Sequence, residues 1–411
     1  MTAYRIIGPE SKIEGTLEIG GSKSISNRIL IIRALSNSQF KITKLSDSDD
    51  TKSLSECLSQ KNKNKFDVHH AGTTYRFLSA YYAISKGVQF LTGSSRMLER
   101  PIKELVECLR EIGADIHYAG KEGYPPLEIG AFKKQLKSHV KIRSDVSSQF
   151  ISALCMIAPC LPDGLNIELK GEPVSQPYLN MTLKLMQEFG IDLKYSNQLI
   201  SIRPQEYKGR DFMVESDWSS ASYHFGLAAI SDNACIRLNH FNNDSLQGDS
   251  ELLSIMPALG VNASIEENCL LLESVDSCVD EFQYDFIEQP DLFQTIAVIA
   301  AAKNIKLKAK GLKTLKLKET DRVKALRNEL SKIGSTLKKP QQLPWEYELI
   351  PSLRFFDNRF DTYNDHRMAM SLSMLSLKQE VIINDPEVVT KSYSNFWEHL
   401  QSLGFMIEKL Q

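Results

Sequence analysis

The chain has 411 residues, of which 42% are hydrophobic and 24% are charged, and its net charge is −2. This length suits two or three domains, and the small net charge gives no general attraction to nucleic acid. The first residues lack the apolar core of a signal peptide, and the longest apolar stretch, 296–302, is too short to span a bilayer. Seven cysteines without a Cys-x-x-Cys pair predict free thiols and no zinc site. We therefore expect a cytoplasmic protein without nucleic-acid or membrane partners.

A strand-like run at 15–19 precedes the segment Gly-Ser-Lys-Ser-Ile-Ser-Asn-Arg at 21–28, which opens an apolar run. Serines before an apolar run are typical of a helix start. Lys23 and Arg28 are both positive there, and the helix dipole disfavours a cation at its N-terminus by a few tenths to ~1 kcal/mol. A bound anion would relieve this conflict; two solvated cations on a surface turn are the alternative interpretation.

Five later helices each end on a glycine that precedes a strand-like segment. These glycines, at positions 113, 190, 260, 334 and 404, are 70 to 77 residues apart. They fit left-handed C-terminal caps, and a period near 70 implies about six copies of one unit. The first copy, near 20–66, is shorter and ends on a polar run.

Each copy holds two helices among strand-like segments, in the order β-α-β-α-β-β. A unit of this length is too large for a thin solenoid repeat, so we expect an α/β (α+β) fold of compact domains. Six units divide into two domains of three. We place one domain at 20–217 and the other at 1–19 and 218–411, with the N-terminal strands pairing into the second.

Cations recur at the predicted helix starts: Arg28, Arg76, Arg96, Arg100, Lys318, Arg322, Arg367 and Lys391. The dipole disfavours cations at such places, so their recurrence predicts helix N-termini that converge on shared anions. Arginine suits bidentate binding of phosphate or carboxylate, and lysine acts as a mobile point charge.

Acids lie among these cations, namely Asp291, Glu319 with Asp321, and Asp365 before His366. Each has a structural alternative, as an N-cap, as an acid that complements a helix dipole or, for the histidine, as a core residue. In a cation-rich site they are also the available proton carriers. The sequence has no phosphate loop, Rossmann glycine triad, nucleophile elbow or metal-spaced His/Cys cluster. We therefore expect neither metal nor cofactor.

Six motifs resemble, in order and over nearly the whole chain, the EPSP synthase (3-phosphoshikimate 1-carboxyvinyltransferase) family of enolpyruvyl transferases. They are GSKSISNR (21–28), AGTTYR (71–76), SRMLERPI (95–102), SSQ (147–149), KETDR (318–322) and YNDHRMAM (363–370). The resemblance implies two domains of three repeats, with helices inside and sheets outside (an inverse α/β barrel), and an active site in the interdomain cleft. We expect a monomer.

The implied reaction transfers the enolpyruvyl group of phosphoenolpyruvate to the 5-hydroxyl of shikimate 3-phosphate. It proceeds by addition and elimination, releases phosphate and serves chorismate and aromatic amino acid biosynthesis. By the resemblance, the 20–217 domain binds mainly shikimate 3-phosphate, and the other supplies acid/base and phosphoenolpyruvate-binding residues. Glyphosate occupies the phosphoenolpyruvate pocket in this family.

The resemblance also assigns residues. Shikimate 3-phosphate is expected to contact Lys23, Ser24, Arg28, Ser147, Ser148, Gln149, Ser175, Tyr178, Asp291, Thr314 and Lys318. Phosphoenolpyruvate is expected to contact Lys23, Gly72, Arg96, Gln149, Arg322, Arg367 and Lys391. The implied catalytic residues are Asp291, which accepts the hydroxyl proton, Glu319, a candidate for protonating the methylene carbon, Lys23 and His366.

The chain departs from the family pattern at His70, commonly asparagine, at Phe77, commonly proline or leucine, and at Thr314, often asparagine. These departures leave the potency of glyphosate and the Thr314 contact open. One alternative is the related UDP-N-acetylglucosamine 1-carboxyvinyltransferase, which usually has an early Lys-Asn pair, whereas Ser24 follows Lys23 here. A non-catalytic anion-binding repeat protein is the other.

Overall fold

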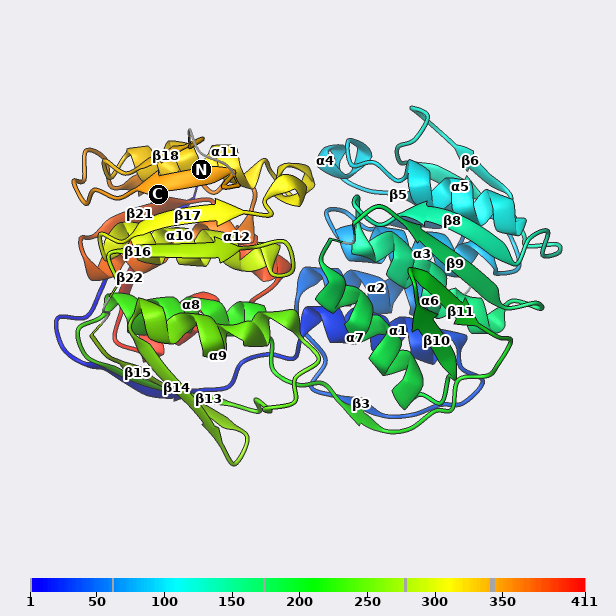
Figure 1. The fold of residues 1–411 in the computed structure, drawn as a ribbon, viewed down its shortest axis with the longest axis horizontal. Helices are drawn as coiled ribbons and strands as arrows, with labels where there is room; N and C mark the ends of the chain where they lie inside the picture. The colour runs from blue at the N-terminus through cyan, green and yellow to red at the C-terminus, as the bar shows by residue number, and fades with distance from the viewer. Residues whose placement is uncertain (1, 61–62, 173, 277–278, 341–343, 411) are drawn as a thin grey trace. The chain divides into compact units, whose positions relative to one another are not determined.

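The chain divides into two compact units. The computed structural model describes residues 2–60, 63–172, 174–276, 279–340 and 344–410. Unit 1 comprises residues 1–20 and 215–411, and unit 2 comprises residues 21–214. These limits lie close to the crossings that the sequence places near 19–21 and 216–218. Figure 1 shows the helices and strands of both units.

Unit 2 combines helices with two four-stranded sheets and one strand pair. Its helices are α1 (Lys23–Leu35), α2 (Asp49–Ser59), α3 (Gly72–Ala83), α4 (Ser95–Leu98), α5 (Lys103–Ile112), α6 (Ser148–Ile157), the 3₁₀ helix η1 (Ala158–Cys160) and α7 (Gln176–Glu188). Its strands are β3 (Ile42–Thr43), β4 (Lys65–Asp67), β5 (Gln89–Thr92), β6 (Ile116–Tyr118), β7 (Leu127–Ile129), β8 (His139–Arg143), β9 (Leu165–Lys170), β10 (Leu193–Ser196), β11 (Leu199–Ile202) and β12 (Phe212–Met213).

Unit 1 carries three four-stranded sheets among its described residues. Its strands are β1 (Ala3–Ile7), β2 (Ile13–Leu17), β13 (Ala234–Asn239), β14 (Val261–Glu266), β15 (Cys269–Ser274), β16 (Glu281–Asp285), β17 (Lys306–Lys310), β18 (Thr336–Lys338), β19 (Tyr347–Ile350), β20 (Arg359–Phe360), β21 (Val381–Asn384) and β22 (Met406–Leu410). Its α-helices are α8 (Trp218–Ile230), α9 (Leu252–Ile255), α10 (Phe293–Ala302), α11 (Arg322–Ser331), α12 (His366–Ser373) and α13 (Phe396–Ser402). Its 3₁₀ helices are η2 (Gly248–Glu251), η3 (Met256–Leu259), η4 (Pro290–Leu292), η5 (Lys313–Leu317), η6 (Met374–Leu377) and η7 (Pro386–Lys391).

One topology recurs in the four-stranded sheets. In the order β16-β17-β19-β18 the first pair is parallel and the other two pairs are antiparallel. The sheets β4-β5-β7-β6 and β8-β9-β11-β10 have the same order within their own segments of chain. With the helices between these strands, each segment forms the β-α-β-α-β-β unit that the sequence predicts.

The N-terminal strands complete two sheets of unit 1. Strand β2 lies parallel to β13 and takes the position that the first strand of a repeat has in the sheets described above. Strand β1 lies between β21 and β22, antiparallel to both, and Ala3 is paired with Leu410. Within the described residues of the short first copy, β3 forms a two-residue parallel pair with β12 near the end of unit 2.

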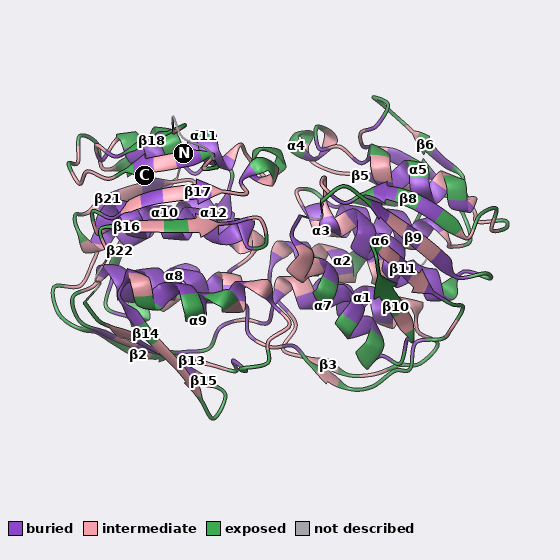
Figure 2. Cartoon of the chain, in the orientation of Figure 1, coloured by how far each residue is buried: buried purple, intermediate pink, exposed green. Residues whose placement is uncertain are grey.

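Helices form the interior of each unit and the sheets cover them. All ten residues of α10 are buried, as its almost continuous apolar sequence predicts for a core helix. The second helix of a repeat is amphipathic; α5 buries Leu105, Cys108, Leu109 and Ile112 along one stripe. Figure 1 shows α10 and α12 behind β16 and β17, and Figure 2 shows these helices as mostly buried. This arrangement confirms the predicted fold.

The five repeat glycines end their helices as predicted: Gly113 and Gly260 are C-cap residues, Gly190 and Gly404 directly follow the C-cap, and Gly334 lies two residues after it. Their φ angles lie between 78° and 120°, a left-handed conformation that side-chain-bearing residues rarely adopt. No helix within the described residues has the length and apolarity that a membrane crossing requires.

Candidate active site

Unit 1 holds a buried charge cluster centred on Arg322, the first residue of α11. Arg322 is 1% exposed and faces three carboxylates. Its Nε donates to Asp365 at 2.7 Å, its Nη1 to Asp291 at 2.8 Å and its Nη2 to Glu319 at 2.7 Å. One guanidinium thus joins acids that are up to 74 residues apart in the chain, because the planar fork offers donors in several directions.

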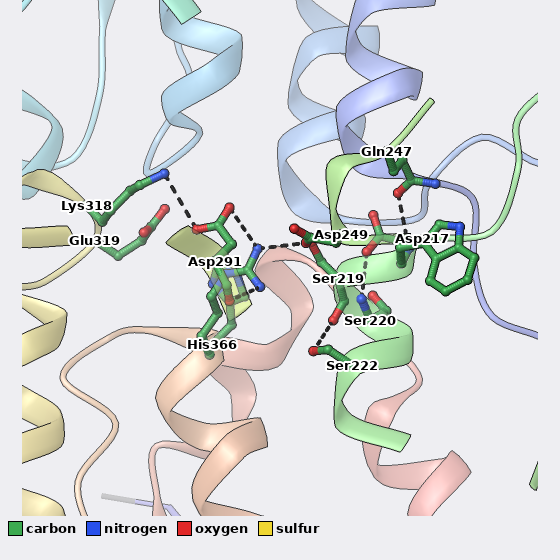
Figure 3. A network of polar contacts seen from close by, with 12 residues as sticks. Asp217, Ser219, Ser220, Ser222, Gln247, Asp249, Asp291, Lys318, Glu319 and His366 are labelled. Atoms are coloured by element: carbon green, nitrogen blue, oxygen red, sulfur yellow. Dashed lines mark hydrogen bonds and ion pairs between the residues drawn. The ribbon is translucent and has the colours of Figure 1, made fainter. Parts of the chain in front are cut away.

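Asp291 meets two further cations. Its Oδ2 lies 3.2 Å from Nη2 of Arg367, and its Oδ1 lies 3.6 Å from Nζ of Lys318. Arg367 also donates from Nη1 to the backbone carbonyl of Asp291 at 3.2 Å. We call Asp291, Lys318, Glu319, Arg322, Asp365 and Arg367 the Arg322 cluster. It brings together most of the residues that the sequence assigns to this half of the site; Figure 3 labels Asp291, Lys318 and Glu319 of this cluster.

Interactions at the starts of α10, α11 and α12 position the residues of the cluster. Asp365 is the N-cap of α12 and accepts the backbone N–H of Arg367 at 2.9 Å, while its other oxygen binds Arg322. Asp321, rather than Glu319, is the N-cap of α11 and accepts from Lys324 N–H, which leaves Glu319 to Arg322. Pro290 opens the 3₁₀ helix η4, which places Asp291 at the start of α10.

Charge and burial act against each other in this cluster. Burial lowers the pKa of the Arg322 guanidinium, but Asp365, Glu319 and Asp291 together raise it above its ordinary value. Burial also lowers the pKa of Lys318, and the nearby Asp291 opposes that shift only in part. Arg322 is therefore a fixed positive charge, whereas Lys318 is closer to giving up its proton.

The remaining predicted residues of unit 1 lie around the cluster. His366 is 2% exposed at the start of α12, with Nδ1 3.8 Å from Asp365. Lys391 ends η7 and donates from Nζ to the carbonyl of Asn364 at 2.5 Å, beside the α12 start. Thr314 lies in η5, and no hydrogen bond within the described ranges joins it to the cluster.

Unit 2 holds a second buried arginine, Arg28 of α1, whose partners are all uncharged. Arg28 is 2% exposed. Its donors reach Thr182 Oγ1 at 2.7 Å, Ser24 O at 2.8 Å, Tyr178 O at 3.1 Å and Ser152 Oγ at 3.4 Å. Burial lowers its pKa to about 10. These five residues, which we call the Arg28 cluster, join α1, α6 and α7, and no described carboxylate forms an ion pair with Arg28.

The predicted serines of unit 2 are found at helix starts. Ser147 caps α6 and accepts Gln149 N–H at 3.3 Å, with Ser148 as the first residue of the helix. Gln149 donates from its side chain to Thr73 Oγ1 at 3.1 Å, next to Gly72 at the start of α3. Lys23 is the first residue of α1, and Ser175 precedes α7.

Gly72, the first residue of α3, lies against Arg100 rather than Arg96. A Cβ at Gly72 would lie 2.5 Å from Nη1 of Arg100, so only glycine leaves this guanidinium its present place. Arg100 is 8% exposed, and its Nε has no hydrogen-bond partner among the described residues. Arg96, in contrast, is exposed and pairs with Glu99 at 3.0 Å. The two arginines of the same short motif thus have different surroundings.

The prediction that all these cations oppose a helix dipole is wrong for several. Arg28 lies in the second turn of α1, and Lys391 ends η7 instead of opening a helix. Lys318 follows the last residue of η5. The carbonyl end of a helix favours a cation, so Lys391 is not in conflict with its own turn. Lys23, Arg96, Arg322 and Arg367 do lie within the first two residues of their helices.

Some polar residues of these clusters were not among the predicted site residues. Tyr223 and Ser219, both on α8, contact Arg367 at 3.5 Å and 3.4 Å, and Asp249 accepts the Ser219 hydroxyl. Thr182 and Ser152 hold Arg28. In the sequence, only the recurrence of serine and aspartate at equivalent helix starts pointed to these residues. No group of three or more His, Cys, Asp or Glu in the described parts of the chain could hold a metal ion.

Comparison with known proteins gives one consistent result. The family model described as EPSP synthase (3-phosphoshikimate 1-carboxyvinyltransferase) matches residues 7–62 and 58–400. A 3-phosphoshikimate 1-carboxyvinyltransferase of Bacteroides fragilis is 41% identical over 412 residues, covering 98% of both chains. One of Tolumonas auensis is 33% identical and covers 96% of this chain and 98% of its own.

Solved structures agree on the fold. EPSP synthase from Acinetobacter baumannii superimposes with a TM-score of 0.79, covering 100% of both chains at 19% identity. The sequence matches extend over nearly the whole chain and include both clusters. The chain therefore belongs to the EPSP synthase (3-phosphoshikimate 1-carboxyvinyltransferase) family.

Proposed function

We propose that this protein transfers the enolpyruvyl group of phosphoenolpyruvate to the 5-hydroxyl of shikimate 3-phosphate. The observation that carries this proposal is the Arg322 cluster, in which three cations and three carboxylates share one buried site. Two anionic substrates repel each other, so cations must hold them together. Carboxylates beside those cations supply the acid and base that the reaction needs.

Asp291 is the base in this proposal and Glu319 the acid. The 5-hydroxyl oxygen bonds to the central carbon of phosphoenolpyruvate while its proton passes to Asp291, and the methylene carbon takes a proton from Glu319. The Glu319 carboxylate then takes a methyl proton as the C–O bond to phosphate breaks, and the departing phosphate takes the proton held by Asp291, which restores the vinyl group and both side chains. Three cations, Lys318, Arg322 and Arg367, lie within 3.6 Å of the Asp291 carboxylate and hold it in place.

Arg100 takes the phosphoenolpyruvate contact that the sequence gives to Arg96. Its buried position against Gly72 supports this choice, since an arginine without a carboxylate or hydrogen bond at Nε suits an anionic ligand. The Arg28 cluster, with Lys23 and the helix-start serines, would then bind shikimate 3-phosphate. That both clusters act on one pair of substrates stays a prediction from the sequence.

Steady-state phosphate release with both substrates tests this function. We expect turnover with shikimate 3-phosphate and none with UDP-N-acetylglucosamine as acceptor. Turnover only with the UDP-sugar would assign the chain to the related carboxyvinyltransferase activity. Binding of both substrates without turnover would instead support a non-catalytic anion-binding protein.

The state and location of the protein are also proposals. We propose a cytoplasmic monomer that needs no metal. Light scattering at working concentration should give the mass of one 46.5 kDa chain, and chelator should leave the rate unchanged. A dimer mass or a chelator-sensitive rate would contradict these two points.

A further inference from the structure

Asp249 connects to the Arg322 cluster through a single serine. The Ser219 hydroxyl donates to Asp249 Oδ2, and Ser219 Oγ lies 3.4 Å from Nη2 of Arg367 as an acceptor. The same Nη2 lies 3.2 Å from Asp291 Oδ2. Figure 3 shows Ser219 and Asp249 close together at the start of α8, with Asp291 beyond them. A chain of polar contacts thus runs from Asp249 to the proposed base.

Gln247 fixes Asp249 at the start of α8. Its side-chain oxygen accepts the Trp218 N–H at 3.1 Å, and its amide donates to Ser216 O at 2.8 Å and Glu215 Oε1 at 2.9 Å. Asp249 follows two residues later in η2 and is 4% exposed. The loop is therefore tied to α8 from two sides, and the carboxylate is held where Ser219 can reach it.

The direction of the Ser219 hydroxyl proton determines whether the Ser219 oxygen can accept a hydrogen bond from Arg367. A hydroxyl has one proton and two lone pairs, and its proton turns to the best acceptor nearby. With the proton directed to Asp249, the lone pairs remain for the Arg367 guanidinium. Tyr223 provides another oxygen, 3.5 Å from Nη1 of Arg367. Arg367 is thereby held between α8 oxygens on one side and Asp291 on the other.

Burying the ionised carboxylate of Asp249 costs free energy, so packing alone does not explain an aspartate at this position. Burial raises the pKa of Asp249 to about 6, and the charge of Asp291 adds to this rise, while Arg367 and Ser219 oppose it. At neutral pH the group is nevertheless mainly ionised. An amide of the same shape would fill the same space without a buried charge.

We propose that Asp249 is a positioning residue for the reaction: through the Ser219 hydroxyl it orients the Arg367 guanidinium toward phosphoenolpyruvate. This inference rests on the proposed function, in which Arg367 binds that substrate. Neither Ser219 nor Asp249 need touch the reacting atoms. Their contribution is to the direction of a cation that does.

The test compares Ser219→Ala and Asp249→Asn with the matched control Ser222→Ala. Ser222 lies one turn along α8, is fully buried and donates to Ser219 O, and within the described part of the chain it forms no hydrogen bond with Arg367 or Asp249. We expect Ser219→Ala and Asp249→Asn each to raise KM for phosphoenolpyruvate about tenfold, the effect of losing one charge-assisted hydrogen bond. KM for shikimate 3-phosphate should stay within twofold, and the double variant should be no worse than the more affected single variant.

Several outcomes would overturn the inference. A KM for phosphoenolpyruvate within twofold of wild type in folded Ser219→Ala would do so, as would an equal rise in Ser222→Ala or an additive double variant. If Asp249→Asn does not fold, Ser219→Ala and its control carry the test alone. A wild-type enzyme without turnover would overturn the proposed function itself, which the same assay distinguishes from a failure of the variants.

Discussion

Arg322 of unit 1 and Arg28 of unit 2 are the most deeply buried arginines described in their units, and their partners differ in kind. Arg322 of unit 1 is enclosed by three carboxylates, whereas Arg28 of unit 2 has only hydroxyl and carbonyl partners. The charge in unit 1 is balanced by the protein itself. In unit 2, the dipoles of hydroxyl and carbonyl groups stabilise Arg28, and no described carboxylate neutralises its charge. An anionic ligand could therefore supply the negative charge.

In the proposed reaction, this difference corresponds to a division between substrate binding in unit 2 and proton transfer in unit 1. A cluster with both signs of charge can move protons among its own members, and unit 1 supplies the acids for that. A cluster with cations and neutral donors can only attract and orient.

Removing the acids of unit 1 should have the largest effect on the rate. Asp291→Asn and Glu319→Gln keep the shape of each side chain but remove the carboxyl group that accepts a proton at Asp291 and donates one at Glu319. General acid–base catalysis contributes about 10²- to 10⁴-fold, so kcat should fall by about that factor in each variant. Steady-state phosphate release measures this, with circular dichroism as a check of folding. Rates within twofold of wild type would refute the assignment of acid and base.

Removing the two arginines should cost different amounts of stability. Arg322→Met removes the guanidinium shared by three carboxylates: Asp291 keeps Arg367 and Lys318, whereas the fully buried Asp365 loses its arginine partner, and the expected loss of unfolding free energy is about 3–5 kcal/mol. Arg28→Met leaves hydroxyls and carbonyls that keep other partners, since the Thr182 hydroxyl lies within hydrogen-bond distance of Ser152 Oγ and Tyr178 O, so about 1–3 kcal/mol is expected.

Urea unfolding can follow the units separately. All three tryptophans, at 218, 345 and 397, belong to unit 1, so their fluorescence reports that unit, and circular dichroism reports both. Equal losses for the two variants would show that the charge balance around Arg322 contributes little.

The paired arginines of unit 2 test where its anion binds. Arg100→Ala should raise KM for phosphoenolpyruvate about 10- to 100-fold, because a charge-assisted contact is lost from a buried position. Arg96→Ala removes an exposed cation of the same motif and should change that KM less than threefold. A larger rise in this KM for Arg96→Ala than for Arg100→Ala would assign the phosphoenolpyruvate contact to Arg96.

The smallest effect concerns pH. The pKa of Asp249 is raised in the folded protein to about 6 from 3.8, so the folded state is penalised above pH 6 and the penalty is relieved as pH falls toward 3.8. Asp249→Asn lacks this penalty. Relative to wild type, the variant should therefore gain about 1 kcal/mol of stability between pH 5 and pH 7.5. Ser222→Ala should show no such pH dependence; a constant difference for Asp249→Asn would mean that its pKa is not raised.

The sequence predicted the features that local chemistry specifies. Capping glycines such as Gly113 and Gly190 need a left-handed backbone, so their spacing revealed the repeat. The helix-start acids Asp291 and Asp365 were found for the same reason, since their neighbours in the chain mark a helix start.

Features that depend on distant partners escaped prediction. Arg96 and Arg100 belong to one motif, and only the position of Gly72 distinguishes the buried one. Asp249 lies 30 residues from Ser219, and nothing local links them. The helix-dipole argument failed at Lys391 because a 3₁₀ turn, which the sequence does not distinguish from an α-helix, ends there.

The pairing of β1 with β22 sets an order in which the chain can be completed during synthesis. Residues 3–7 leave the ribosome first, yet their strand partners are residues 381–384 and 406–410, which leave it last. Unit 2 is one uninterrupted segment, 21–214, and has all its own strands long before that point. We expect it to fold while unit 1 still waits for its final strand, because contacts so distant in sequence form late. The Arg322 cluster, with its buried carboxylates, is therefore assembled only near the end of translation.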